Sequence, residues 1–285
     1  KVLELVTRLD QTDLCLCLIT GGGSALLPAP RPPVTLEDKL RVTKLLSSRG
    51  ASIQELNQVR IGLSEVKGGG LLNQCKARLI TLLVSDILGD PIDLIASGPT
   101  VPCSEANQSP HLVLQKYLSK NEISSAVWSS LETWRPAKSS TNDRIECHVL
   151  GNNRTATQAA EAQARSFGLP VEFIEPEAAN ADAETVAARI VWKVRQAKER
   201  PYCLVWGGEP IVKLGSTPGR GGRNQQLALA ALAQWNQIPE STRDRLCILS
   251  GGTDGEDGPT DAAGAFVDTA ILDAAERLGL DAPDH

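Results

Sequence analysis

The sequence is poor in the residues that form common metal and membrane sites. Its 285 residues include no Met and only three His, so a His-rich metal site is excluded. Aromatic residues make up 4%, so Leu, Val, Ile and Ala must form the hydrophobic core. No apolar run approaches the ~20 residues that a membrane-spanning helix needs, and no signal-peptide pattern is present. We therefore expect no membrane partner. Because the chain begins at Lys1 rather than Met, we expect it to be part of a longer polypeptide.

Paired cysteine motifs are also missing. Cys occurs seven times, an odd number, and there is no CxxC pair. Cys15, Cys17, Cys203 and Cys247 lie in apolar runs, where a reduced thiol packs as a small hydrophobic side chain. We therefore predict reduced thiols and a cytoplasmic location.

Clusters of like charge are absent as well. The net charge is −5, and no block of five or more like charges occurs. A nucleic-acid-binding surface needs clustered Lys and Arg, so nucleic acid is not expected as a partner. A small anion held in a local basic pocket remains possible.

Short apolar runs alternate with longer helical patterns, which is typical of a parallel sheet covered by helices. We predict an α/β fold with mostly parallel sheets, in two α/β domains with a cleft between them. The domains are expected at 1–140 and 141–285, with the boundary near 136–143. Positions 101–145 are interpreted as surface excursions. The strands are expected to be buried on both faces and are predicted at Leu14–Ile19, Leu79–Val84, Cys147–Leu150, Val171–Ile174, Tyr202–Val205 and Leu246–Leu249.

Two helices carry clear start signals. Thr35 and Ser52 are each followed three residues later by an acidic residue, which predicts capping boxes. Gly50 is expected to end the first helix in a left-handed conformation. The second is predicted to continue through Val66 to the glycines at 68–70, which would place Arg60 and Lys67 on one face. Further helices are predicted at Ala156–Phe167, Ala183–Ala197, Gln225–Trp235 and Ala270–Leu278.

Glycines or small polar residues follow five of the predicted strands. Ligands bind beyond the carboxyl ends of strands in open α/β sheets, so these loops predict a shared crevice. The loops begin at Gly21, Ser85, Gly151, Gly207 and Gly251. In Gly21–Ser24 the backbone N–H groups can approach an anion, although the run also suits a plain tight turn. Neither GxGxxG nor GxxxxGK[ST] occurs, which excludes the usual dinucleotide fingerprint and the P-loop.

Basic residues lie in or beside two glycine-rich segments. Gly219–Asn224 contains Arg220 and Arg223 before a predicted helix, and guanidinium groups bind phosphate or carboxylate in a bidentate manner. Lys67 immediately precedes three glycines, where it could bind a ligand or simply complement the dipole of a helix.

Carboxylates concentrate in the segment 252–261, which contains Asp254 and Asp257. Close like charges are costly unless a cation neutralises them, and Mg²⁺ prefers carboxylate, phosphate and water oxygens. Each Asp could equally be a helix cap or turn residue. Because no Cys–His or Ser–His pair is evident, the set of loops favours phosphoryl transfer, which depends on positioning and charge neutralisation.

Six motifs together resemble the class II glycerate kinases. They are LITGGGSALLPAP, NQVRIGLSEVKGGGL, SDILGDPIDLIASGPT, GGEP, GRGGRNQQLAL and GGTDGEDGPTDAAGA. The resemblance covers nearly the whole chain and implies a first, Rossmann-like domain followed by a domain that includes a MOFRL region from about residue 200. It also implies ATP-dependent phosphorylation of D-glycerate with Mg²⁺, with 2-phosphoglycerate favoured as the product.

Family members usually also have an N-terminal segment with a Gly-Lys-Ala motif and a C-terminal Thr-Gly-rich segment, and neither occurs in these 285 residues. In family members a basic residue followed by a larger residue is usual at the positions of Ile61 and Gly62.

The resemblance and the loop chemistry together give a set of candidate site residues. As catalytic residues we predict Lys67, Asp86 and Arg223. As substrate- or phosphate-binding residues we predict Gly21, Gly22, Gly23, Ser24, Arg60, Glu209, Arg220 and Asn224. As metal ligands we predict Asp90, Asp254 and Asp257. Two alternatives are an NAD-dependent hydroxypyruvate reductase and a non-catalytic, anion-binding paralogue. The protein is expected to be a monomer or a homodimer.

Overall fold

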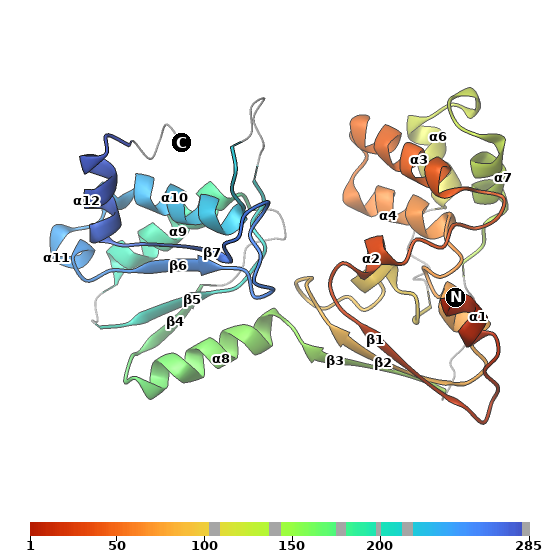
Figure 1. Ribbon diagram of the computed structural model, residues 1–285, viewed down its shortest axis with the longest axis horizontal. Coiled ribbons are helices and arrows are strands. Elements are labelled where there is room, and N and C mark those ends of the chain that lie inside the picture. The colour runs from red at the N-terminus through yellow and green to blue at the C-terminus, as the bar shows by residue number, and fades with distance from the viewer. Residues whose placement is uncertain (103–108, 137–143, 175–180, 198–200, 213–218, 281–285) are drawn as a thin grey trace. The chain divides into compact units, whose positions relative to one another are not determined.

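The computed structural model describes residues 1–102, 109–136, 144–174, 181–197, 201–212 and 219–280. The chain forms two compact units, Lys1–Asn153 and Arg154–His285, and each is considered by itself (Figure 1). The boundary predicted near 136–143 lies almost wholly outside the described residues. None of the helices formed by the described residues is both long and apolar enough to span a membrane.

The first unit is built around a three-stranded parallel sheet of order β1-β2-β3. Its elements are α1 (Val2–Val6), β1 (Leu14–Ile19), α2 (Gly23–Leu26), α3 (Leu36–Ser48), α4 (Ile53–Gly62), α5 (Gly70–Gln74), β2 (Arg78–Val84), η1 (Ile95–Ser97), α6 (Pro110–Tyr117), η2 (Lys120–Glu122), α7 (Ser125–Thr133) and β3 (Ile145–Gly151). Because the strands are parallel, the loops that follow them begin at the same edge of the sheet.

Only one face of this sheet is well covered within the unit. Leu79 and Leu83 of β2 are buried, and Ile19 of β1 lies on the same face, opposite Leu83. On the other face Leu14 and Leu18 of β1 are 58% and 70% exposed. The strands were placed correctly from their apolar runs, but the prediction that they are buried on both faces is wrong for β1.

Two capping boxes begin the helices α3 and α4, as predicted. The Thr35 and Ser52 side chains each accept a hydrogen bond from a backbone N–H three residues on, and the acidic side chain there accepts one in return. Gly50 has φ of 79°, in the left-handed region that ends a helix readily only at glycine. The predicted continuation of α4 to Val66 is wrong, because the helix ends at Gly62.

The segment predicted as a surface excursion contributes two helices to the core. Leu114 of α6 and Leu131 of α7 are 0% and 1% exposed, and they pack with Val59 of α4 and Leu46 of α3. Figure 1 shows these four helices grouped together on one side of the sheet. The interpretation of positions 101–145 as surface is therefore wrong for α6 and α7, whose short apolar stretches face the other helices.

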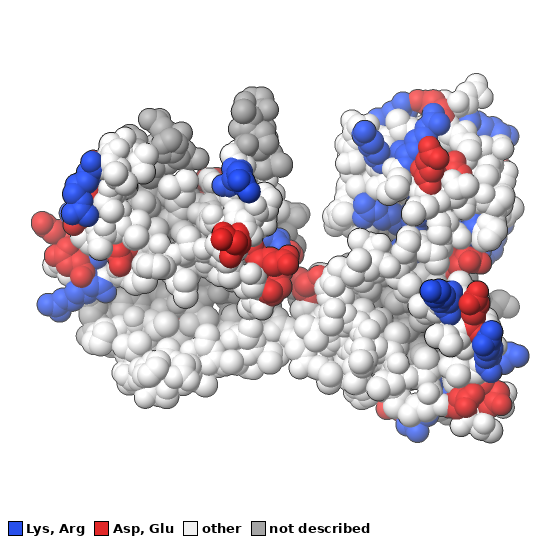
Figure 2. Space-filling model, viewed as in Figure 1, with Lys and Arg blue, Asp and Glu red and all other residues white. Residues whose placement is uncertain are grey.

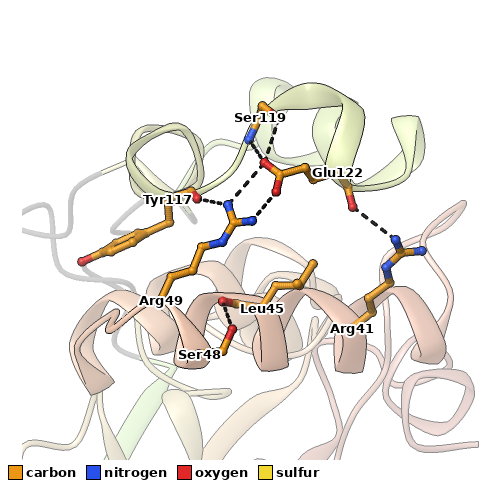
Figure 3. Close-up of polar contacts among 7 residues, drawn as sticks. All are labelled: Arg41, Leu45, Ser48, Arg49, Tyr117, Ser119 and Glu122. Atoms are coloured by element: carbon orange, nitrogen blue, oxygen red, sulfur yellow. Dashed lines mark hydrogen bonds and ion pairs between the residues drawn. The ribbon is translucent and has the colours of Figure 1, made fainter.

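Polar contacts join the end of α3 to the segment after α6 (Figure 3). The Arg49 guanidinium pairs with the Glu122 carboxylate, whose pKa falls to about 2 because of hydrogen bonds from Arg49 and Ser119. Arg49 also donates to the carbonyl of Tyr117, and Arg41 donates to the carbonyl of Glu122 at 3.4 Å. These contacts anchor a loop that is remote in sequence from α3.

The second unit contains a parallel pair, β4-β5, and an antiparallel pair, β6-β7. Its elements are α8 (Asn153–Ser166), β4 (Val171–Ile174), α9 (Ala183–Gln196), β5 (Cys203–Trp206), α10 (Arg223–Ala233), η3 (Trp235–Gln237), α11 (Glu240–Arg243), β6 (Ile248–Gly251), β7 (Gly264–Val267) and α12 (Thr269–Arg277). The strand β7 was not predicted from the sequence.

The helix α10 lies at the centre of this unit. Its residues Leu227 and Ala231 are 2% and 0% exposed, and they share a core with Val191 of α9, Ile248 of β6 and the fully buried Trp235. The start of α10 is therefore held firmly, which matters because the predicted arginine loop ends there. The face drawn in Figure 2 shows acidic and basic side chains interspersed on each unit.

The six described cysteines are free thiols, in agreement with the predicted reduced state. Cys75 is buried, and Cys15 and Cys17 pack against the same core. Burial is the main reason that the pKa of Cys15 rises to about 11. Cys247, which was expected to be packed, is exposed.

Candidate functional site

The loops after β1 and β2 meet in the first unit, as the strand-end argument predicts. A Cβ atom placed on Gly21 would lie 2.9 Å from Oδ2 of Asp86, so the backbone at Gly21 approaches this carboxylate closely. Further along the second loop, Asp90 accepts a hydrogen bond from the Asn152 side chain beyond β3. The ends of all three strands therefore contribute to one edge, and the exposed Asp86 lies beside the glycine loop.

Lys67 extends into this edge from the turn between α4 and α5. Its side chain is buried at 4% exposure, and Nζ donates to the Ser24 carbonyl at 2.7 Å and to Ser24 Oγ at 2.6 Å. Nζ also lies 3.4 Å from Ser97 Oγ, which is 2.9 Å from Ser24 Oγ. Burial, followed by the nearby charges of Lys39 and Arg60, lowers the pKa of Lys67 to about 8.

The backbone that surrounds Lys67 adopts an unusual conformation. Ala96 and Ser97 have φ of 51° and 63°, which is uncommon for residues other than glycine. Their segment is held by hydrogen bonds from Gly68 N to the Ser97 carbonyl and from Gly69 N to the Gly98 carbonyl, both at 2.8 Å. Strained backbone of this kind concentrates at functional sites. Here it places the Ser97 hydroxyl beside Lys67 and Ser24.

Arg60 acts on Lys67 electrostatically, but the two residues do not lie on one helix as predicted. It lies on α4 and donates to Asn57 Oδ1 at 3.2 Å, whereas Lys67 lies beyond the end of that helix. The two residues therefore do not share a helical face. Arg60 nevertheless contributes to lowering the pKa of Lys67, because a nearby positive charge disfavours a second one.

Lys39 is a functional candidate that the sequence interpretation missed. Its side chain is 7% exposed, and Nζ donates to the Pro28 carbonyl at 3.0 Å. Burial and the charge of Arg60 lower its pKa to about 8. A signal was available, because Lys39 precedes the buried Val42 and Leu46 by three and seven residues, which places a cation on the apolar face of α3. Ser97 had no comparable sequence signal, since its role depends on the left-handed backbone.

In the second unit, the predicted residues Arg223 and Glu209 form an ion pair. The side chains are 45% and 57% exposed, so both remain accessible to a ligand. Arg223 is the first residue of α10, and the exposed Arg220 lies in the loop before it. The structure thus brings together a guanidinium and a carboxylate that sequence reasoning had assigned separately.

Asp257 caps the start of α10. Its carboxylate is 2% exposed and accepts hydrogen bonds from the backbone N–H groups of Asn224 at 2.9 Å and Gln225 at 2.8 Å. Burial acts to raise its pKa, but these bonds outweigh that effect and lower it. A Cβ atom on Gly222 would lie 2.3 Å from Oδ1 of Asp257, so glycine is required for this close approach. Asp257 is better explained as a helix cap than as the predicted metal ligand.

The other predicted residues of this region have different positions. The Asn224 side chain accepts from Ser250 Oγ at 2.7 Å and donates to Asp257, so it fixes the loop geometry. Asp254 is exposed, and its carboxylate accepts from the backbone of Glu256 at 3.2 Å. Among the residues that the structure describes, no group of three or more His, Cys, Asp and Glu side chains is arranged to hold a metal ion.

The geometry defines an α/β protein that presents glycine loops and cationic side chains beyond the ends of its strands. Comparison with known proteins identifies the family. Residues 1–132 match the family model "Domain of unknown function (DUF4147)", and residues 202–285 match the MOFRL family. The chain is 39% identical to glycerate kinase of Macaca fascicularis, over 98% of this chain and 81% of that one. This chain belongs to the class II glycerate kinase family.

Other relatives show how much of the family's length is present. Over 98% of its length the chain is 39% identical to human glycerate kinase, of which it spans 61%. It is 37% identical to a D-glycerate 2-kinase from Thermotoga maritima, over 99% of this chain and 66% of that one. A crystal structure of glycerate kinase from Thermotoga maritima superposes with a TM-score of 0.82 at 34% identity, covering 99% of this chain and 67% of the other. The chain thus spans less than two thirds of several relatives.

Proposed function

We propose that this chain catalyses, or supplies much of the machinery for, the ATP-dependent phosphorylation of D-glycerate, with 2-phosphoglycerate as the product. In this reaction a bond forms between a glycerate hydroxyl oxygen and the γ-phosphorus of ATP, the bond from that phosphorus to the ADP oxygen breaks, and the hydroxyl proton is released. The relatives named glycerate kinase and D-glycerate 2-kinase support the proposal.

The environment of Lys67 is the main structural support for this proposed function. A lysine at 4% exposure donates to Ser24 in the glycine loop and lies beside a second hydroxyl, that of Ser97. Burial lowers its pKa to about 8, so its positive charge is less favourable in the free protein than that of an ordinary lysine. A negatively charged group bound here stabilises the protonated lysine, and developing negative charge in the transition state does so more strongly. Lys67 is therefore suited to phosphoryl transfer.

The neighbouring carboxylate supplies a second function. Asp86 is exposed and lies against the backbone of Gly21, so a substrate hydroxyl placed over the glycine loop would meet it. A carboxylate in that position accepts a hydrogen bond from the hydroxyl and can take its proton as the new bond forms. We assign Asp86 this role.

The loop 219–224 is assigned to the phosphates of ATP. Arg220 and Arg223 are exposed at the start of α10, and Arg223 is held by Glu209. A guanidinium at a helix N-terminus matches the charge of a phosphate and offers paired donors. The hydrogen bonds of Asp257 and Asn224 fix the conformation of this loop.

Mg²⁺ is the expected companion of ATP, because Mg²⁺ is bound by one or two carboxylates together with phosphate oxygens. Asp254 fits such a role, since its carboxylate is exposed and, among the described residues, accepts a hydrogen bond from the backbone N–H of Glu256. Asp90 is the further candidate within the first unit. The ion would neutralise phosphate charge. The protein is further proposed to act in the cytoplasm as a monomer or homodimer.

Three assays on the purified protein test this function. Release of ADP, coupled to an enzymatic readout, should depend on both ATP and D-glycerate. Oxidation of NADH with hydroxypyruvate should be absent, and its presence would instead support a reductase. Calorimetry that detects ATP binding in a protein with no glycerate-dependent ADP release would favour the non-catalytic paralogue and refute the proposed activity.

A further inference from the structure

Three cationic side chains from separate parts of the first unit act electrostatically on one another, and two of them, Lys39 and Lys67, contact the glycine loop or the segment just after it. Lys39 comes from α3, Arg60 from α4 and Lys67 from the turn before α5. Arg60 acts on both lysines, and Lys39 acts on Lys67, in each case disfavouring the positive charge. Sequence reasoning had singled out Arg60 and Lys67 only, and Lys39 joins them through its position on the buried face of α3.

The two lysines bind the same stretch of chain at two points. Lys67 donates to the carbonyl of Ser24 at 2.7 Å, and Lys39 donates to the carbonyl of Pro28 at 3.0 Å. The segment between these carbonyls contains the second half of α2, a helix that begins within the glycine loop. The two buried ammonium groups therefore fix this segment at both ends.

Nothing described in the unit neutralises this charge. The ion pairs found between described residues involve other side chains, and the charged groups that act on Lys39 and Lys67 are all cationic. Burying an ammonium group without a counter-ion is costly. Neutral donor groups could bind these carbonyl oxygens at a lower desolvation cost. Fixing the loop therefore does not by itself account for two buried lysines and an arginine.

We propose that Lys39, Arg60 and Lys67 form a binding pocket for a doubly charged oxyanion, namely the phosphoryl group that enters or leaves the site. A carboxylate carries one negative charge and leaves most of the cationic charge unbalanced, whereas a phosphoryl dianion offsets more of it. The proposal rests on the proposed function for the identity of the ligand. It goes further in committing this pocket to the transferred phosphoryl group rather than to the carboxylate of glycerate, and in making Lys39 part of it.

Sulfate is the probe of choice, because it remains a dianion across the pH range in which the lysines titrate. Isothermal titration of the wild-type protein at pH 8 should show sulfate binding. The titration is run in two buffers of different ionisation enthalpy. Net proton uptake should accompany binding, because the bound anion raises the pKa values of Lys39 and Lys67 from about 8. Absence of proton uptake on sulfate binding would overturn the proposal, whether or not the protein is an active kinase.

A matched pair of variants on α3 separates the pocket from general charge effects. Lys39→Gln should weaken sulfate binding about tenfold or more, the loss expected for a charge-assisted hydrogen bond, and should reduce proton uptake. Lys44→Gln removes an exposed lysine from the same helix and should leave both unchanged. Equal weakening in the two variants would refute a local pocket, and unchanged binding in a folded Lys39→Gln would show that Lys39 only fixes the loop.

Acetate distinguishes the two kinds of anion. At equal ionic strength acetate should compete poorly with sulfate, since it offers a single charge. Tighter binding of acetate than of sulfate would contradict the assignment to a phosphoryl group. Because none of these titrations requires ATP or turnover, their outcome is independent of the glycerate kinase assay.

Discussion

Nζ of Lys67 lies 2.6 Å from Oγ of Ser24, although 43 residues separate them in the chain. The contact joins the glycine loop after β1 to the glycine-rich turn before α5, so two motifs that look independent in the sequence form one structure. It also buries a cation at the edge of the sheet where ligands of α/β proteins bind. The consequences of that burial can be measured.

The buried lysines should make stability depend on pH in the alkaline range. The pKa of Lys39 and of Lys67 is about 8 in the folded protein, against an ordinary value of 10.5. Between these values the unfolded chain keeps more protons on these lysines, so their contribution to the free energy of unfolding should increase with pH, by up to about 1.4 kcal/mol per pH unit for each lysine. Below pH 8 this contribution should be flat. Urea unfolding at constant ionic strength from pH 7 to 10 measures it.

The Lys67→Met variant provides the control for that effect. It should lose roughly half of the lysine contribution, whereas Lys44→Met should retain all of it. Buried thiols such as Cys15, whose pKa is raised, act in the opposite direction above about pH 9, so the difference between variants is the test. A pH dependence of stability in Lys67→Met equal to that of the wild type would contradict the account of burial.

Arg223 should matter to catalysis far more than to folding. Its side chain is 45% exposed and pairs with Glu209, so its removal should barely change stability. If its guanidinium faces the phosphates of ATP, Arg223→Ala should lose about 3 kcal/mol of transition-state stabilisation, or about a hundredfold in kcat/KM. Arg277→Ala, at an exposed site on α12, is the matched control. Unchanged turnover in Arg223→Ala would refute the role.

Asp257 should contribute to the stability of the second unit. Asp257→Ala leaves the N–H groups of Asn224 and Gln225 without their acceptor, which should cost about 2–3 kcal/mol. Since the pKa of Asp257 is lowered in the folded state, its stabilisation is present above the unfolded value of 3.8 and is lost as the pH falls through the folded value. Denaturant midpoints report the change. A loss as large in Asp254→Ala, where the carboxylate is exposed, would argue against a specific cap.

The Arg49–Glu122 contact in Figure 3 should stabilise the first unit slightly and leave catalysis untouched. Glu122→Gln removes the carboxylate whose pKa the hydrogen bonds from Arg49 and Ser119 lower to about 2, together with the reciprocal cap at Ser119. We expect a small drop in melting temperature with unchanged kcat. A large drop in activity would mean that this loop is coupled to the site.

Local patterns in the sequence predicted the elements of the fold well. The capping boxes at Thr35 and Ser52 are complete within four residues, so no distant contact was needed to recognise them. The end of α4 depended on tertiary packing instead. A Cβ atom on Gly62 would lie 2.5 Å from Leu131 of α7, and the chain leaves the helix there although the apolar period continues to Val66.

The site was predicted as a set of loops rather than as an arrangement of side chains. Gly21 and Asp86 were expected at one edge because parallel strands end together, and they lie there. Lys39 was missed although its place on the apolar face of α3 was a signal, and its contact with Pro28 could not be read from the sequence. Ser97 was missed because its position depends on a left-handed φ of 63°. Asp257 was predicted as a metal ligand because it lies in a loop rich in carboxylates. Its role as a cap could not be recognised, because the two backbone donors lie more than thirty residues earlier in the chain.

The most direct test of the account measures phosphoglycerate formed from ATP and D-glycerate by the wild-type protein and by Lys67→Met, with Lys44→Met as the control. The account predicts ATP-dependent product from the wild type and the control, and a loss of about a hundredfold or more in a folded Lys67→Met. Full activity in Lys67→Met would contradict the central role given to the buried lysine, and absence of phosphoglycerate from the wild type would contradict the proposed reaction.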